Sequence, residues 1–351
     1  MTTILGIDLG KFKSVVCVFC PETGEIAFET IKTEPEAFRE FLGKKAPTMT
    51  IFETSTAASW VYDLCQQRGL ACTVANPLGE AWQWKKVKRK TDRDDAHKLV
   101  RMYLMNELPT VHMPSPEIRE HRALVGFRQK LIERRTAIRN HVRALFQAQG
   151  LNLPAAHQAW TVEALAHWRT TYARAITDCG SGEFWMGELE VELALLEALG
   201  TQIKQVEKKL DALGAENTGV ELLKTIPGVG PRTAEAVVAY LGDPHRFHNS
   251  REVSSYAGLV PRQFQSGTMD RKGRITKRGP APLRKLLVEC AWLMRRHNPW
   301  GANLVDRISR GQKVRMKVAV VALARKLLVC CWAMLKKNQP WKSPEIVPAA
   351  T

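Results

Sequence analysis

Acidic side chains are scarce in this sequence. Its 351 residues carry 35 Asp and Glu against 52 Lys and Arg, which gives a formal net charge of +17. A surplus of positive charge this large favours a polyanionic partner, and nucleic acid is the first candidate. A generic basic surface is the alternative.

Long hydrophobic runs are also expected to be missing. The N-terminal stretch MTTILGIDLGKFK is apolar over too few residues for a signal peptide, and it contains an aspartate. We expect no stretch to reach the length of a membrane span, and we find no basic amphipathic anchor. A cytoplasmic protein without a membrane partner is therefore expected.

The eight cysteines lack the arrangement of a metal site. Cys17 and Cys20 have CxxC spacing, but they lie in a strand-like segment, where residues three apart point to opposite faces. No second pair completes a zinc site. We expect reduced thiols, which agrees with a cytosolic setting.

The first part of the chain, 1–108, alternates strand and helix patterns. Three β-rich runs come first, TTILGIDL, SVVCVFC and ETGEIAFETIKT, and helix and strand signals alternate after them. This order is that of an RNase H-like α/β domain.

The second part, 109–217, is predicted to be a helical coiled-coil arm. One long helix begins near Pro116, and another begins near Gly187. The arm would pair with itself or with another subunit, and an intramolecular helical bundle is the alternative. The first helix has apolar residues at heptad spacing: Leu124, Leu131, Ile138 and Leu145.

The third part, 218–342, is predicted to be a helical domain, and 343–351 a flexible tail. The segment LLKTIPGVGPRTAEAVVAYL has a helix-hairpin-helix pattern, in which the amides around Gly228 and Gly230 could hold a phosphate. Basic residues then crowd a short span with few acids, which makes it a candidate nucleic-acid surface. They are Arg262, Arg271, Lys272, Arg274, Lys277 and Arg278.

Four acidic residues of the first part form a candidate site. Asp8 ends one apolar strand, and Glu53 ends another. An RNase H-like sheet places such strand ends side by side. In the helix-like segment DRDDAHKL, Asp92 and Asp95 share a face, whereas Asp94 turns aside. The alternative for each acid alone is a cap or a turn residue.

Such a cluster of carboxylates predicts a divalent cation. Four carboxylates cannot remain ionised together without cations, and their hard oxygen atoms suit Mg²⁺ or Mn²⁺. Two such ions can act on one phosphodiester. The preceding run WKKVKRK would steer a phosphate backbone to the cluster, and a solvated helix face is its alternative. The run supplies five candidate contacts: Lys85, Lys86, Lys88, Arg89 and Lys90.

These residues together resemble a known family over nearly the whole chain. The order Asp8, Glu53, Asp92 and Asp95, the helical middle, and the motifs GLVPRQFQSG, GRITKRG and LRKLL resemble the DEDD transposases of insertion sequences. The resemblance implies a RuvC-like first domain and a C-terminal transposase domain whose serine, Ser266 here, becomes joined to DNA.

The resemblance further implies partners and assembly. DNA would be bound at the element ends and at the target, and a bridge RNA would pair with target and donor DNA. A homo-oligomer, from dimer to tetramer, would share active sites between subunits. The protein would be associated with the bacterial nucleoid.

The residues themselves give Ser266 weaker support than they give the acids. Most loop serines are turn residues. In favour of a catalytic role, Gly267 lets the backbone approach a phosphate, and the surrounding arginines could stabilise charge on phosphorus. Metal held by the acids could activate the hydroxyl.

Three other functions compete with recombination. One is a metal-dependent Holliday-junction resolvase or nuclease without a covalent intermediate. Another is a non-catalytic nucleic-acid-binding scaffold. The stretch GIDLGK also resembles the first phosphate loop of actin-like sugar kinases, but the later glycine-rich motifs of that class are absent from the sequence.

Overall fold

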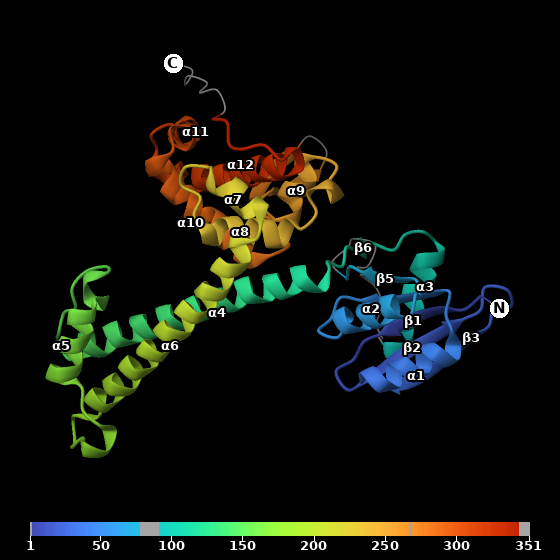
Figure 1. Cartoon of the computed structure of the whole chain (residues 1–351), viewed down its shortest axis with the longest axis horizontal. Coiled ribbons are helices and arrows are strands. Elements are labelled where there is room, and N and C mark those ends of the chain that lie inside the picture. The colour runs from blue at the N-terminus through green and yellow to red at the C-terminus, as the bar shows by residue number, and fades with distance from the viewer. Residues whose placement is uncertain (1, 78–90, 267–268, 344–351) are drawn as a thin grey trace. The chain divides into compact units, whose positions relative to one another are not determined.

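The computed structural model describes residues 2–77, 91–266 and 269–343. The chain divides into two compact units, Met1–Pro114 and Ser115–Thr351 (Figure 1). The helical arm and the C-terminal helices, expected as separate parts, both fall within the second unit.

The first unit is built on a mixed sheet with the order β3-β2-β1-β4-β5-β6. The first three strands form an antiparallel meander, β4 lies parallel to β1, and β5 lies parallel to β4. The predicted mixed α/β domain with three leading strands is confirmed. The strands are β1 (Ile4–Asp8), β2 (Lys13–Phe19), β3 (Ile26–Lys32), β4 (Met49–Glu53), β5 (Cys72–Ala75) and β6 (Thr110–Val111).

Helices cover both faces of this sheet. α1 and α2 pack on the face that carries Leu5 and Ile7, and α3 packs on the opposite face. α3 comes closest at Gly6, where an added Cβ would lie 2.2 Å from the carbonyl oxygen of Ala96. Only glycine fits there, because a side chain would push α3 off the sheet. The helices are α1 (Pro35–Lys45), α2 (Ala58–Gln67) and α3 (Asp92–Leu104).

Two long helices, α4 (Pro116–Ala148) and α6 (Phe184–Ala215), begin the second unit and pack against each other. The heptad leucine Leu131 is fully buried, and the other three heptad residues are partly buried. This intramolecular pairing is the alternative that the sequence left open. Pairing of the arm with another subunit stays a prediction.

A third helix, α5 (Val162–Tyr172), packs against α6 beside α4 (Figure 1). An aromatic cluster joins the three helices, because the ring of Phe146 lies 5.3 Å from those of Trp168 and Tyr172 and 6.1 Å from that of Trp185. Short 3₁₀ helices, η2 (Gln158–Trp160) and η3 (Ile176–Asp178), flank α5.

The C-terminal helices share one large core. The segment Lys313–Lys337, which contains α12, is long and apolar enough to cross a membrane, so the expectation that no such stretch exists was wrong. Of its apolar side chains, Leu323, Leu327 and Leu328 are fully buried in the core of this unit, whereas Val318 is 65% exposed. The elements are α7 (Thr218–Lys224), α8 (Pro231–Leu241), η4 (Pro244–Arg246), α9 (Ser250–Tyr256), α10 (Ala281–His297), α11 (Pro299–Ser309), η5 (Lys313–Arg315) and α12 (Met316–Lys337).

A β-hairpin interrupts these helices, where only helices were expected. β7 (Pro261–Ser266) and β8 (Met269–Ile275) pair antiparallel as a separate two-stranded sheet. Nearly every described side chain on it is exposed. Because neither face is buried, the sequence has no alternation of apolar and polar residues to reveal it.

Candidate active site and nucleic-acid surface

Asp8 and Glu53 end neighbouring parallel strands. Ile7 pairs with Phe52 in the register of β1 and β4, so the two acids follow at the same edge of the sheet. Side chains alternate along a strand, which places both acids on the face that carries Gly6 and α3. Each acid is half-buried. The sheet thus brings these two strand ends together, as the sequence led us to expect.

The three aspartates in the first turn of α3 differ in their contacts and their exposure. Thr91 is the N-cap, and its Oγ1 donates a hydrogen bond of 2.6 Å to Asp94 Oδ2 and accepts one of 3.2 Å from the Asp94 amide. The Thr91 hydroxyl thus caps the helix, and the Asp94 carboxylate holds that hydroxyl in place. Asp95 is half-buried beside Ala96, the residue that contacts Gly6, and Asp92 is exposed.

The four carboxylates are chemically suited to bind a divalent cation. All four predicted ligands offer hard oxygen atoms, and two of them end adjacent strands under the helix that carries the other two. Within residues 2–77, 91–266 and 269–343, however, no three Asp, Glu, His or Cys side chains lie close enough together to hold a metal ion. The closed four-carboxylate cluster therefore stays a prediction.

The basic run that was expected to steer phosphates lies outside the described residues. It comprises Lys85, Lys86, Lys88, Arg89 and Lys90.

Ser266 is the last residue of β7 and is exposed. It pairs with Met269 across the hairpin, and the Gln263 amide donates a hydrogen bond of 3.0 Å to Asp270 nearby. The same hairpin displays four of the predicted nucleic-acid-binding cations, all exposed: Arg262, Arg271, Lys272 and Arg274.

Close backbone contacts fix the base of the hairpin. An added Cβ at Gly258 would lie 2.0 Å from the carbonyl oxygen of Arg278, and the Lys277 amide donates to the Gly258 carbonyl at 3.1 Å. The Arg284 guanidinium donates to the carbonyls of Ala257, Arg278 and Gly279 at 3.2, 3.0 and 2.9 Å. Lys277 and Arg278 are thus held in place with exposed side chains. Sequence reasoning missed this positioning role of Arg284.

The two glycines of the predicted helix-hairpin-helix differ in environment. Gly228, at φ +94°, packs against α10, since an added Cβ would lie 2.9 Å from Met294 Cγ. Its backbone conformation and this contact explain the glycine without a ligand. Gly230 is exposed as the N-cap of α8, and nothing lies within 4 Å of its missing Cβ. Phosphate binding at these glycines stays a prediction.

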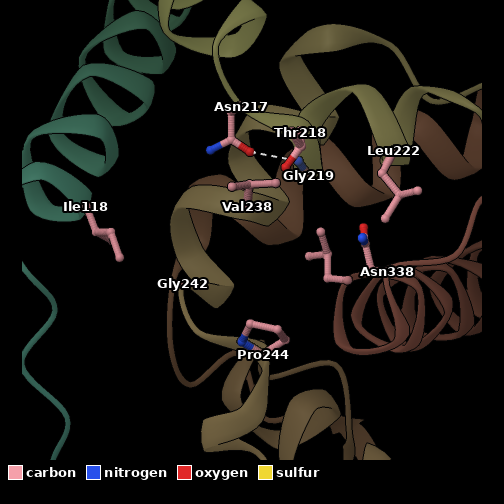
Figure 2. Close-up of a pocket in the computed structure, with 10 residues that line it drawn as sticks. Ile118, Asn217, Thr218, Gly219, Leu222, Val238, Gly242, Pro244 and Asn338 are labelled. Atoms are coloured by element: carbon pink, nitrogen blue, oxygen red, sulfur yellow. Dashed lines mark hydrogen bonds between the residues drawn. The ribbon is translucent and has the colours of Figure 1, made fainter.

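A pocket beside this segment lacks catalytic groups. It encloses about 310 Å³ between α4, α7, α8 and α12, and none of its lining side chains is titratable (Figure 2). Asn217 Oδ1 accepts a hydrogen bond of 3.0 Å from the Gly219 amide and caps α7 there. The pocket therefore offers no acid or base, and the Thr218 hydroxyl on its wall has no base beside it among the lining residues.

Comparisons with known proteins identify the family. A family model described as Transposase, DEDD_Tnp_IS110, matches residues 5–149, and another, Transposase IS116/IS110/IS902 family, matches residues 220–306. The transposase y4rJ of Sinorhizobium fredii (strain NBRC 101917 / NGR234) is 30% identical over 80% of this chain and 75% of its own length. The transposase for insertion sequence element IS1111A of Coxiella burnetii (strain RSA 493 / Nine Mile phase I) is 28% identical over 92% and 86%.

Among solved structures, T. thermophilus RuvC in complex with Holliday junction substrate matches 32% of this chain and 100% of its own chain. The sequence identity is 14% and the TM-score is 0.24.

Family models cover both the sheet with its acids and most of the helical core with the hairpin. The chain therefore belongs to the DEDD transposases of insertion sequences and is an enzyme that cleaves and rejoins DNA.

Proposed function

We propose that this transposase cuts DNA with the hydroxyl of Ser266 and rejoins the strands through a phosphoserine ester. The observation that carries the proposal is the position of Ser266 at the exposed end of β7. The same hairpin carries exposed cations, and Arg271 pairs with Phe264, two residues before Ser266. A phosphodiester can reach the hydroxyl there, and the cations would stabilise negative charge that develops on phosphorus.

The proposed step exchanges one phosphate ester for another. Ser266 Oγ loses its proton and bonds to phosphorus, while the bond from phosphorus to one deoxyribose oxygen breaks. The released oxygen takes up a proton and becomes a strand-end hydroxyl. Because the serine ester conserves the bond energy, a hydroxyl of another strand can displace the serine without ATP.

Asp8, Glu53, Asp92 and Asp95 would hold Mg²⁺ or Mn²⁺. The support is the shared sheet edge of the first two acids and the packing of α3 over their face. When bound, the ion would offset charge on the phosphate and favour ionisation of an attacking group. The residues themselves would fix the ion at the sheet edge, since strand ends and a capped helix are rigid supports.

The partners follow from the family and from charge. DNA at element ends and target, together with a bridge RNA, would meet the exposed basic hairpin, the Gly230 end of α8 and the run at 84–90. A net charge of +17 supports binding to polyanions. A dimer or tetramer that shares active sites, in the bacterial cytoplasm near the nucleoid, completes the proposal.

Hydrolysis without a covalent intermediate is the second candidate. One observation favours it: all four acids belong to the first compact unit, Met1–Pro114, which does not contain the serine. A nuclease of this kind would leave free strand ends. Membership of an enzyme family sets the non-catalytic scaffold aside.

A nicked suicide substrate separates the two candidates. Wild type should trap a protein–DNA adduct that resists boiling in detergent, and Ser266→Ala should trap none while it still binds DNA. Thr268→Ala is the matched control, since it removes a hydroxyl two residues away, and should trap the adduct. Strand rejoining by Ser266→Ala would refute the serine mechanism and leave hydrolysis by the acids.

A further inference from the structure

A basic cavity lies in the arm, far along the sequence from the acids and the serine. It encloses about 560 Å³ between η2, α4, α5 and α6. Four cationic side chains line it, and its one carboxylate belongs to Glu197. Arg169 already forms an ion pair with that carboxylate at 3.1 Å. We call this space the arm cavity, and its cations are Arg135, Arg139, Arg169 and Lys204.

Arg135 and Arg139 are one helical turn apart on α4 and lack counter-charges. In the described part of the chain, neither guanidinium forms an ion pair, and the Nε atom of each is buried without a hydrogen-bond partner. Burial and the repulsion of Arg135 and Arg143 lower the pKa of Arg139. Because neither guanidinium has a counter-charge, an anion that enters the cavity would offset their mutual repulsion and accept charge-assisted hydrogen bonds.

Neighbouring groups hold the guanidinium of Arg139 in place. It lies 5.2 Å from the centre of the Trp160 ring, and that of Arg143 lies 5.3 Å from the same ring. Arg143 is anchored in turn, because it donates to the carbonyls of Pro154 and Ala156. The Arg139 donors are therefore preorganised at the cavity.

The rest of the cavity wall is apolar. Leu165 comes from α5, and Leu193 and Leu196 come from α6. Val162, also on the wall, is 80% exposed, so this apolar surface is open to solvent. A ligand that matches the cavity has an anionic group beside a weakly polar body. A volume of this size falls within the range of small-ligand pockets, about 300–1,000 Å³.

We propose that the arm cavity binds one nucleotide unit of a single-stranded nucleic acid. Its phosphate would contact Arg135, Arg139 and Lys204, and its base would lie against the leucine wall. A strand is favoured over a free nucleotide because the enzyme acts on DNA and the whole chain carries a net charge of +17. This contact is separate from the proposed serine chemistry.

Photo-crosslinking in the full-length protein tests the site. The probe is a short oligothymidylate that carries 4-thiothymidine, and crosslinked residues are mapped by mass spectrometry. We expect crosslinks within 160–169 or 193–204. Arg135→Gln/Arg139→Gln should abolish them and lower the slope of log K against log salt by about 0.7 for each lost phosphate contact. No crosslink in these segments would overturn the site.

Lys130→Gln/Arg134→Gln is the matched control. It removes two exposed cations from the same helix outside the cavity, and it should keep the crosslinks. Equal loss in both double variants would contradict the proposal. The cavity variant should also melt no lower than wild type, since it relieves repulsion. If thymidine monophosphate competes as well as the oligonucleotide, the assignment to a strand is wrong.

Discussion

Thr91 and Asp94 cap α3 by bonding to each other: the threonine hydroxyl donates to the carboxylate at 2.6 Å, and the aspartate amide donates back at 3.2 Å. This pair explains one member of the acidic segment DRDD without any catalytic role. The capped helix begins at Asp92 and packs through Ala96 on Gly6 of β1. Asp92 and Asp95 remain as the candidates for the active site.

Asp94→Asn should leave strand cleavage close to wild type, because the Asp94 carboxylate supports the helix cap. The free energy of unfolding should fall by at most about 1 kcal/mol, measured by urea denaturation. Thr91→Ala is the control and should show a similar loss of stability with cleavage retained. An Asp94→Asn protein that folds and binds DNA but does not cleave it would count against this division of roles.

Asp8→Asn and Glu53→Gln should each abolish cleavage and spare DNA binding, because each removes a carboxylate charge with little change in shape. Gel assays of cleavage and binding at one salt concentration measure both. Glu36→Gln, an exposed carboxylate on α1, is a control that should cleave normally. Cleavage by Asp8→Asn at the wild-type rate would remove that residue from the site.

Gly6→Ala should weaken both the fold and the activity. The new Cβ would lie 2.2 Å from the Ala96 carbonyl oxygen and 2.7 Å from Val100 Cγ2, so α3 must shift together with Asp92 and Asp95. Overpacking of this kind costs about 1–3 kcal/mol. Gly200→Ala in α6, with nothing within 4 Å, should be neutral or stabilising. Wild-type melting and cleavage of Gly6→Ala would show that α3 does not pack there.

Glu235 should make stability depend on pH. It is 1% exposed in α8, 3.1 Å from Arg232, and burial raises the pKa of its carboxyl above the ordinary 4.5. The folded state then binds the proton more tightly, so this group's contribution to stability is lost as pH rises from 4.5 to the raised pKa. Urea denaturation at several pH values in this range should show that the free energy of unfolding falls less steeply with pH in Glu235→Gln than in wild type.

Glu252→Gln serves as the control for that profile. Hydrogen bonds from His248 lower the pKa of Glu252, so its contribution has the opposite sign and is lost as pH falls. Above pH 4.5, the free energy of unfolding of Glu252→Gln should therefore fall with pH as steeply as that of wild type. Identical profiles for wild type and Glu235→Gln would refute the assignment.

The sheet and its two acids could be predicted because short-range rules decide them. Strand alternation and chain order put Asp8 and Glu53 at one sheet edge. The packing at Gly6 could not be predicted, since it depends on where α3 meets the sheet. In the sequence, GIDLGK resembles a phosphate loop. In the structure, the first glycine of this stretch, Gly6, instead allows the backbone of Ala96 in α3 to pack against β1.

The hairpin and the long apolar run of α12 were both missed in the sequence, for opposite reasons. The hairpin exposes nearly all its described side chains, so burial leaves no period in its sequence. The sequence feature that could have predicted the hairpin is the pair of residues between Ser266 and Met269, which contains a glycine. α12 lies in the core of its unit, so its apolar run is long enough to imitate a membrane span.

Peptide mapping of the trapped adduct tests the central claim most directly. Trypsin should release residues 263–271, which contain Ser266, after nuclease digestion has trimmed the bound DNA. We predict that this peptide carries a nucleotide phosphate and that fragmentation places it on Ser266 Oγ rather than on Thr268. An adduct on any other residue, or cleaved DNA with peptide 263–271 unmodified, would contradict the serine mechanism.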